Sequence, residues 1–233
     1  MNKPIKVIQV ALLSLCLAGC QQRTFLIDES ELDEERIPVM FSGTIQTRMA
    51  DNAWEADDKI GVFMFKTGQT EVTNAVIDNS NNRKYIYSSD NKYFSPATKN
   101  DTLFYPQDAN VDFISYYPYS AVEDYQLKLD VSVQADPSSI DLLYSNNLTN
   151  ITKGNTQQTL QFTHRLAKTV FNIQAGTDFN AKDLVGLKLS VEDVAASATF
   201  NIFKNELTLS SNSNKTITAK TNEQGPQIGR AHV

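Results

Sequence analysis

Cysteine is nearly absent from this sequence of 233 residues: there are two, Cys16 and Cys20, and both lie within the first 20 positions. The remainder of the chain can therefore form no disulfide and no cysteine-based metal site. Histidine is also scarce, and His164 is the single one within the body of the chain, whereas metal sites need three or four donors. We expect neither a metal nor a cofactor, and a core that holds by packing alone.

An excess of basic charge is also missing. The formal net charge is −6, which argues against nucleic-acid binding, since that function requires a basic face. Beyond residue 20, no apolar run approaches the roughly 20 residues that span a bilayer. No Gly-x-Ser-x-Gly elbow is present, and the adjacent acids Asp57-Asp58 and Glu192-Asp193 would point to opposite faces of a strand. The sequence therefore predicts no catalytic residue, no enzymatic activity and no nucleic-acid partner.

The N-terminus has the organisation of an export signal. Lys3 and Lys6 precede a short apolar run, 7–17, and the segment ends Leu17-Ala18-Gly19-Cys20. This ending resembles the lipobox of bacterial lipoproteins. The resemblance implies that residues 1–19 are removed and that Cys20 is acylated, which would attach the chain to outer-membrane lipid. The alternative is an ordinary signal peptide with an incidental cysteine.

Strand patterns follow an acidic spacer. Residues 20–36 carry six acids and are predicted to be a solvated tether. IGVFMF (60–65) is a continuous apolar run, typical of a strand buried on both faces, and YQLKLDVSV (125–133) alternates through Val133. Short strands separated by polar turns predict an all-β protein built from β-sandwiches. We place domains at 37–155 and 156–227, divided at the polar loop 146–158.

An ordered set of segments resembles one protein family. FSGTIQTRMADNAWEADDKIGVFMF (41–65) is similar to the opening of fimbrillin-family proteins, and later landmarks follow in the same order: FYP (104–106), DFISYYPY (112–119), DLLYSNN (141–147) and LQFTHRLAKTVFNI (160–173). The resemblance covers roughly residues 17–210. It implies transthyretin-like β-sandwich domains in series and a lipoprotein precursor of a type V pilus, exposed on the outer membrane, that becomes part of a fimbrium used in adhesion.

The same resemblance implies assembly by strand exchange. A trypsin-like protease cuts after an arginine near the N-terminus, removing the anchor and first strand, and a strand from another fimbrial subunit fills the groove. Arg48 is the favoured site because it lies in a polar loop and a cut there would release FSGTI; Arg36 is the other candidate. The alternative is that both are ordinary surface arginines. Shaft, anchor and tip roles are not distinguished.

Two alternative functions remain open from the residues. A surface glycan-binding lipoprotein would share the anchor and the β-sandwich, and would stack sugars on Trp54, Tyr116, Tyr117 or Tyr119. A tethered hydrolase would need a catalytic set that the sequence does not display. Asp101-Thr102-Leu103 also resembles a short O-glycosylation site.

The last six residues, IGRAHV (228–233), match no strand pattern and correspond to a translated sequencing-adapter oligonucleotide. We therefore expect these residues to have no structural or functional role, and the second domain to be incomplete.

Overall fold

The computed structural model describes ten stretches of the chain: 36–46, 53–69, 77, 80–134, 136–154, 157–173, 175–178, 180–211, 214–218 and 228–232. Strands dominate these residues. The helical segments within them are three short 3-10 turns, η3 (Lys99–Asp101), η4 (Pro137–Ser139) and η5 (Ala181–Leu184). The predicted all-β class is confirmed. In the part of the chain that the structure describes, no helix has the length and apolar character needed to cross a bilayer.

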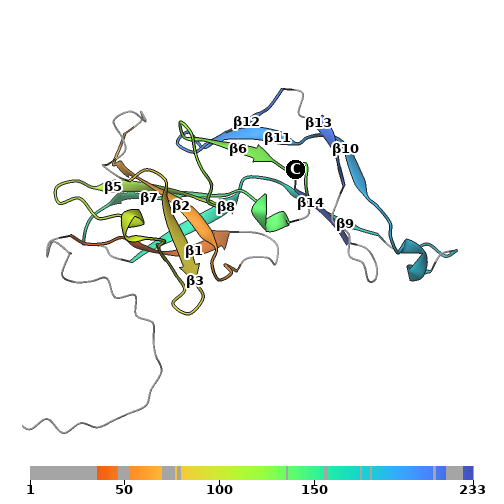
Figure 1. Cartoon of the computed structure of the whole chain (residues 1–233), viewed down its shortest axis with the longest axis horizontal. Coiled ribbons are helices and arrows are strands. Elements are labelled where there is room, and N and C mark those ends of the chain that lie inside the picture. Colours follow the sequence, from red (N-terminus) through yellow and green to blue (C-terminus); the bar gives the residue numbers. More distant parts are fainter. Residues whose placement is uncertain are drawn as a thin grey trace, which may run out of the picture. The chain divides into compact units, whose positions relative to one another are not determined.

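Seven strands close into a barrel in the order β1-β4-β3-β2-β5-β7-β8. Most of these strands are labelled in Figure 1. Their bounds are β1 (Met40–Gln46), β2 (Lys59–Lys66), β3 (Arg83–Ser88), β4 (Tyr93–Pro96), β5 (Val111–Tyr117), β7 (Leu143–Ile151) and β8 (Gln157–His164). Neighbouring strands run antiparallel, with one exception. β1 and β8 are parallel, from Met40 opposite Gln157 to Gln46 opposite Thr163.

β2 is buried on both faces because it separates two hydrophobic cores. Ile60, Val62 and Met64 contribute to the core formed with the other barrel strands. The alternate residues Phe63 and Phe65 belong to a second cluster. Because side chains alternate along a strand, a continuous apolar run is the sequence of a strand with an apolar environment on each side. The prediction for residues 60–65 is confirmed.

The second cluster joins the barrel to a three-stranded sheet of order β12-β11-β6. This sheet consists of β6 (Gln126–Asp130), β11 (Ser197–Asn201) and β12 (Glu206–Leu209). Phe200 of β11 is fully buried, with its ring 5.3 Å from that of Tyr144 on β7. The Tyr144 hydroxyl also donates a hydrogen bond of 3.0 Å to the carbonyl of Ile202. Aromatic packing and a buried hydrogen bond therefore hold this sheet to the barrel.

Two smaller sheets complete the described elements. One pairs β10 (Ser190–Ala195) with β13 (Asn214–Thr218), and the other pairs β9 (Lys168–Asn172) with β14 (Ile228–His232). The expectation that 228–233 match no strand was wrong, because Ile228–His232 form an antiparallel ladder with β9. Ladder hydrogen bonds join backbone groups, so a segment without a strand-like pattern can form one. The adapter origin of these residues stays a prediction.

Two other expectations about local structure were also wrong. Segment 146–158 is largely strand and not loop, since β7 continues to Ile151 and β8, starting at Gln157, closes the barrel against β1. The domain limits themselves stay a prediction. β6 ends at Asp130, whose carboxylate accepts the backbone N–H of Ser132, and Val133 beyond this turn is 68% exposed. A side chain that hydrogen-bonds the backbone two residues on competes with the ladder and ends the strand.

Candidate functional site

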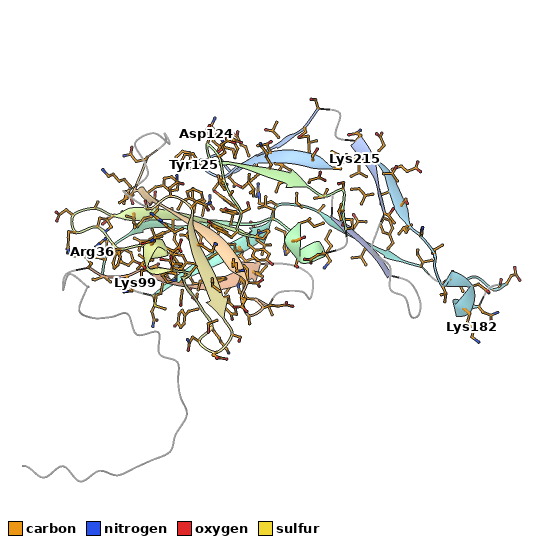
Figure 2. All side chains as sticks on the ribbon, viewed as in Figure 1. Arg36, Lys99, Asp124, Tyr125, Lys182 and Lys215 are labelled. Atoms are coloured by element: carbon orange, nitrogen blue, oxygen red, sulfur yellow. The ribbon has the colours of Figure 1, made fainter. Side chains whose placement is uncertain are left out.

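Two of the three predicted site residues, Cys20 and Arg48, lie outside the described residues. The third, Arg36, is the first described residue and is labelled in Figure 2. It is exposed, and its guanidinium carbon lies 4.0 Å from the centroid of the Phe104 ring. The carbonyl of the next residue, Ile37, accepts the N–H of Tyr105 at 3.0 Å. Arg36 therefore stands where the chain enters the paired segment that continues into β1.

β1 supplies large side chains to the barrel core. Val39, just before the strand, and Phe41 have no exposed surface, and Ile45 on the same face is half-buried. The Phe41 ring lies edge-on to the rings of Tyr85 and Phe113, with centroid distances of 5.4 and 5.1 Å. Burial of a side chain such as Val or Phe contributes about 1.5–3 kcal/mol. The core therefore depends on β1.

On one side, β1 pairs with β8 along its whole length. Seven residue pairs form the parallel ladder. Outward-facing side chains extend this contact: the hydroxyls of Ser42 and Thr159 are 2.8 Å apart, and the amide of Gln46 donates to the side-chain oxygen of Gln161 at 3.0 Å. A long backbone ladder with a polar outer face holds a strand without demanding one particular sequence.

On the other side of residues 39–46 the backbone pairing is shorter, and two side-chain donors supplement it. A single residue pair, Phe41 opposite Phe94, joins β1 to β4. The Tyr85 hydroxyl donates to the carbonyl of Val39 at 3.1 Å, and the indole N–H of Trp54 donates to the carbonyl of Gly43 at 3.0 Å. Burial raises the pKa of the Tyr85 hydroxyl, which extends into alkaline solution the pH range over which it can donate. Both bonds are accepted by main-chain carbonyl oxygens, so neither needs a side-chain acceptor on the strand in this position.

Gly43 is the point of closest approach between β1 and its surroundings. A Cβ atom at this position would lie 2.8 Å from Cε2 of Phe94 and 3.0 Å from Nε1 of Trp54. Real Cβ atoms essentially never lie as close as 2.8 Å to such a neighbour, so the Phe94 ring would have to move, and the Trp54 indole would have to shift slightly. Sequence reasoning did not identify Gly43 or Tyr85 as site residues. A glycine inside a strand pattern was the available signal, since it often marks a close approach of another group.

Trp54 forms a wall of this site. Its ring packs edge-on against Phe94, Tyr117 and Phe162, with centroid distances of 4.9, 5.5 and 5.0 Å. Tyr116, another residue considered for sugar stacking, is fully buried, and its hydroxyl donates to the carbonyl of Ser120 at 2.7 Å. These two aromatic side chains are therefore engaged in internal packing and hydrogen bonding.

The remaining polar candidates are engaged locally. Nδ1 of His164 lies 2.9 Å from a carboxylate oxygen of Asp141. Asp101 accepts hydrogen bonds from the Lys84 backbone N–H and from the Thr98 hydroxyl. Across the described ranges, no group of three or more His, Cys, Asp or Glu side chains is placed to hold a metal ion.

Comparison with known proteins agrees with this architecture. A family model described as Fimbrillin-like matches residues 47–228. The proposed fimbrium subunit Fim1C of Bacteroides uniformis is 33% identical over 164 residues, covering 68% of this chain and 52% of that protein. The chain thus spans about half the length of this curated relative.

Solved structures share the fold. A crystal structure of a proposed cell adhesion protein from Bacteroides uniformis matches with a TM-score of 0.70 at 27% identity, covering 86% of this chain and 75% of that one. A second, from Bacteroides ovatus, gives a TM-score of 0.65 at 18% identity, with coverage of 85% and 78%. The resemblance to the fimbrillin family that was drawn from the sequence is confirmed. The chain belongs to the fimbrillin-like family.

Proposed function

We propose that this protein is a fimbrial subunit that is exported as a lipoprotein, held at the outer membrane through Cys20, and assembled by exchanging β1 for a strand of a neighbouring subunit. The observation that supports this proposal is the position of β1. It is the first strand of the described chain, it fills the core, and its long ladder joins it to β8, more than 110 residues away in sequence. Such a strand can be detached by one cut in the chain.

Removal of β1 would leave an open groove that another strand can fill. The β8 edge would lose its parallel ladder, and the places of Val39 and Phe41 in the core would be empty. Unpaired strand edges and apolar pockets favour pairing with another chain. A donor strand restores both the backbone hydrogen bonds and the side-chain packing, which is β-augmentation. Cleavage would thus switch the subunit from a closed monomer to a polymerising form.

The sequence between the first two strands restricts where a trypsin-like cut can act. Between the end of β1 at Gln46 and the start of β2 at Lys59, Arg48 is the only lysine or arginine. A cut after Arg48 separates β1 from the rest of the barrel. A cut after Arg36 leaves β1 attached. Arg48 is therefore the proposed processing site, and Arg36 the matched control.

The processing step is tested by examining surface filaments from cells that carry Arg48→Gln or Arg36→Gln. We expect unsubstituted and Arg36→Gln subunits in filaments to begin at Met49, and Arg48→Gln to give no filaments, as seen by electron microscopy and N-terminal sequencing. Filaments whose subunits still begin at Cys20 would contradict assembly by cleavage.

The anchor is tested separately. Two or more acyl chains hold a protein on a bilayer durably, whereas one does not. Cys20→Ala should abolish incorporation of labelled fatty acid, and Cys16→Ala, which alters the other cysteine of the signal segment, should not. Continued labelling of Cys20→Ala would refute the lipoprotein assignment while leaving strand exchange open.

A further inference from the structure

We infer that the donor strand is selected by a glycine: the segment that replaces β1 carries apolar residues at the positions of Val39, Phe41 and Ile45, and glycine at the position of Gly43. This inference rests on the proposed exchange of β1 and specifies the partner that the exchange requires. The pattern reads apolar-x-apolar-x-Gly-x-apolar, and the segment runs parallel to β8.

The side-chain requirements follow from what surrounds each inward position. The Phe41 site is enclosed by the rings of Tyr85 and Phe113, which fit a large apolar residue. The Ile45 site is only partly covered and tolerates apolar residues of different size. The Gly43 site could take even one methyl group only if the rings of Phe94 and Trp54 shifted. The side chain that each position accepts therefore differs: a large one at the position of Phe41, none at Gly43, and one of intermediate size at Ile45.

The hydrogen bonds couple main-chain recognition to the glycine. Trp54 donates to the carbonyl of residue 43, and the Cβ of any other residue there would contact the same indole nitrogen at 3.0 Å. A larger residue would therefore displace both the Phe94 ring and the donor that holds the strand. The Tyr85 bond to the carbonyl of Val39 carries no such restriction, since that position already holds a branched side chain. The hydrogen bond from Trp54 therefore forms only with a strand whose backbone comes as close as that of Gly43.

This spacing is rare within the chain itself. The sequence contains nine glycines, and Gly43 is the one among them with apolar residues four and two positions before it and two positions after it. The segments around Gly61 and Gly186 place lysines at one or more of these positions. A second copy of these 233 residues could therefore offer only its own β1 segment. The pattern identifies candidate donor segments in the sequences of other subunits.

The single tryptophan makes the inference measurable. Trp54 is the only tryptophan in the chain and touches the site of residue 43. The full chain is cut at Arg48 by limited trypsin treatment, the cut is verified by N-terminal sequencing, and the fragment that carries β1 is removed in mild denaturant before the denaturant is dialysed away. The remaining chain is then mixed with dansyl-labelled peptides of residues 37–46. Energy transfer from Trp54 to dansyl reports seating in this groove.

Three peptides separate the outcomes: the native sequence, one with Gly43→Val, and one with Thr44→Val, whose change faces outward. We expect the native and Thr44→Val peptides to bind alike, and the Gly43→Val peptide to bind at least tenfold more weakly. Equal binding of the Gly43→Val and native peptides overturns glycine selection but leaves strand exchange intact. Failure of the native peptide to enter the cut chain overturns strand exchange itself, and the inference with it.

Discussion

At the scale of single residues, the site is defined by ring atoms that pack closely against the backbone of β1. Gly43 is required because of what lies across from its backbone, namely the Phe94 ring and the Trp54 indole. Trp54 and Tyr85 in turn are held by aromatic neighbours, so their donors stay aimed at β1. The local sequence does not reveal these contacts, because Gly43 is there only one small residue in an alternating segment.

Replacing Gly43 should therefore destabilise the intact chain. Forcing extra carbon atoms into a filled space costs about 1–3 kcal/mol, and we expect Gly43→Val to lower the free energy of unfolding by about 2 kcal/mol. Thr44→Val changes the adjacent, exposed position and should stay within about 0.5 kcal/mol of the unsubstituted protein. Urea denaturation followed by Trp54 fluorescence measures both. Equal midpoints for the two variants would show that the site can expand.

The Tyr85 hydroxyl should contribute comparably. It donates to the Val39 carbonyl and accepts the N–H of Leu103 at 3.2 Å, both within the core. Tyr85→Phe leaves two buried backbone groups without this partner, which costs about 1–3 kcal/mol for each group left unsatisfied. Tyr93→Phe on β4 is the control, since that side chain is half-buried and no described group bonds its hydroxyl. A shift in urea midpoint no larger than that of Tyr93→Phe would contradict this role.

At the scale of elements, strands with strong local patterns were predictable and their partners were not. The apolar run at 60–65 and the alternation at 127–129 appear in the sequence because burial on two faces or one has a local signature. The end of β6 at Asp130 depends on a side-chain turn, which alternation does not reveal. The parallel pairing of β1 with β8 joins segments about 117 positions apart and has no local signature at all.

Because β2 separates two hydrophobic cores, a substitution in one core should destabilise the strands around that core more than those around the other. Phe200 lies in the cluster between the barrel and the β12-β11-β6 sheet, and not in the barrel core. We expect Phe200→Ala to cost about 3–5 kcal/mol and to raise hydrogen exchange first in β6 and β11. Phe41→Ala, in the barrel core, should raise exchange first in β1 and β8. Uniform acceleration in both variants would indicate a single cooperative unit.

At the scale of the whole molecule, the buried tyrosines give the fold a common response to alkali. Burial raises the pKa of Tyr116 to about 12 and that of Tyr144 to about 12, and it also raises the pKa of Tyr85. In the unfolded chain these groups titrate near pH 10. For Tyr116 and Tyr144, this contribution to stability is therefore complete below about pH 10 and is lost as pH rises from about 10 to about 12.

The sign follows from proton binding. Above pH 10 the unfolded chain has released protons that the folded chain still holds, so the free energy of unfolding falls with pH, by up to about 1.4 kcal/mol per pH unit for each group. Tyr144→Phe removes one such group and should flatten the dependence between pH 10 and 12, whatever its effect at neutral pH. Urea midpoints at pH 8 and pH 11, with phenolate absorbance at 295 nm as a direct titration, measure the difference. If the variant and the unsubstituted protein lose stability with the same slope, Tyr144 ionises as readily in the fold as in water, and its burial against Phe200 is not maintained in solution.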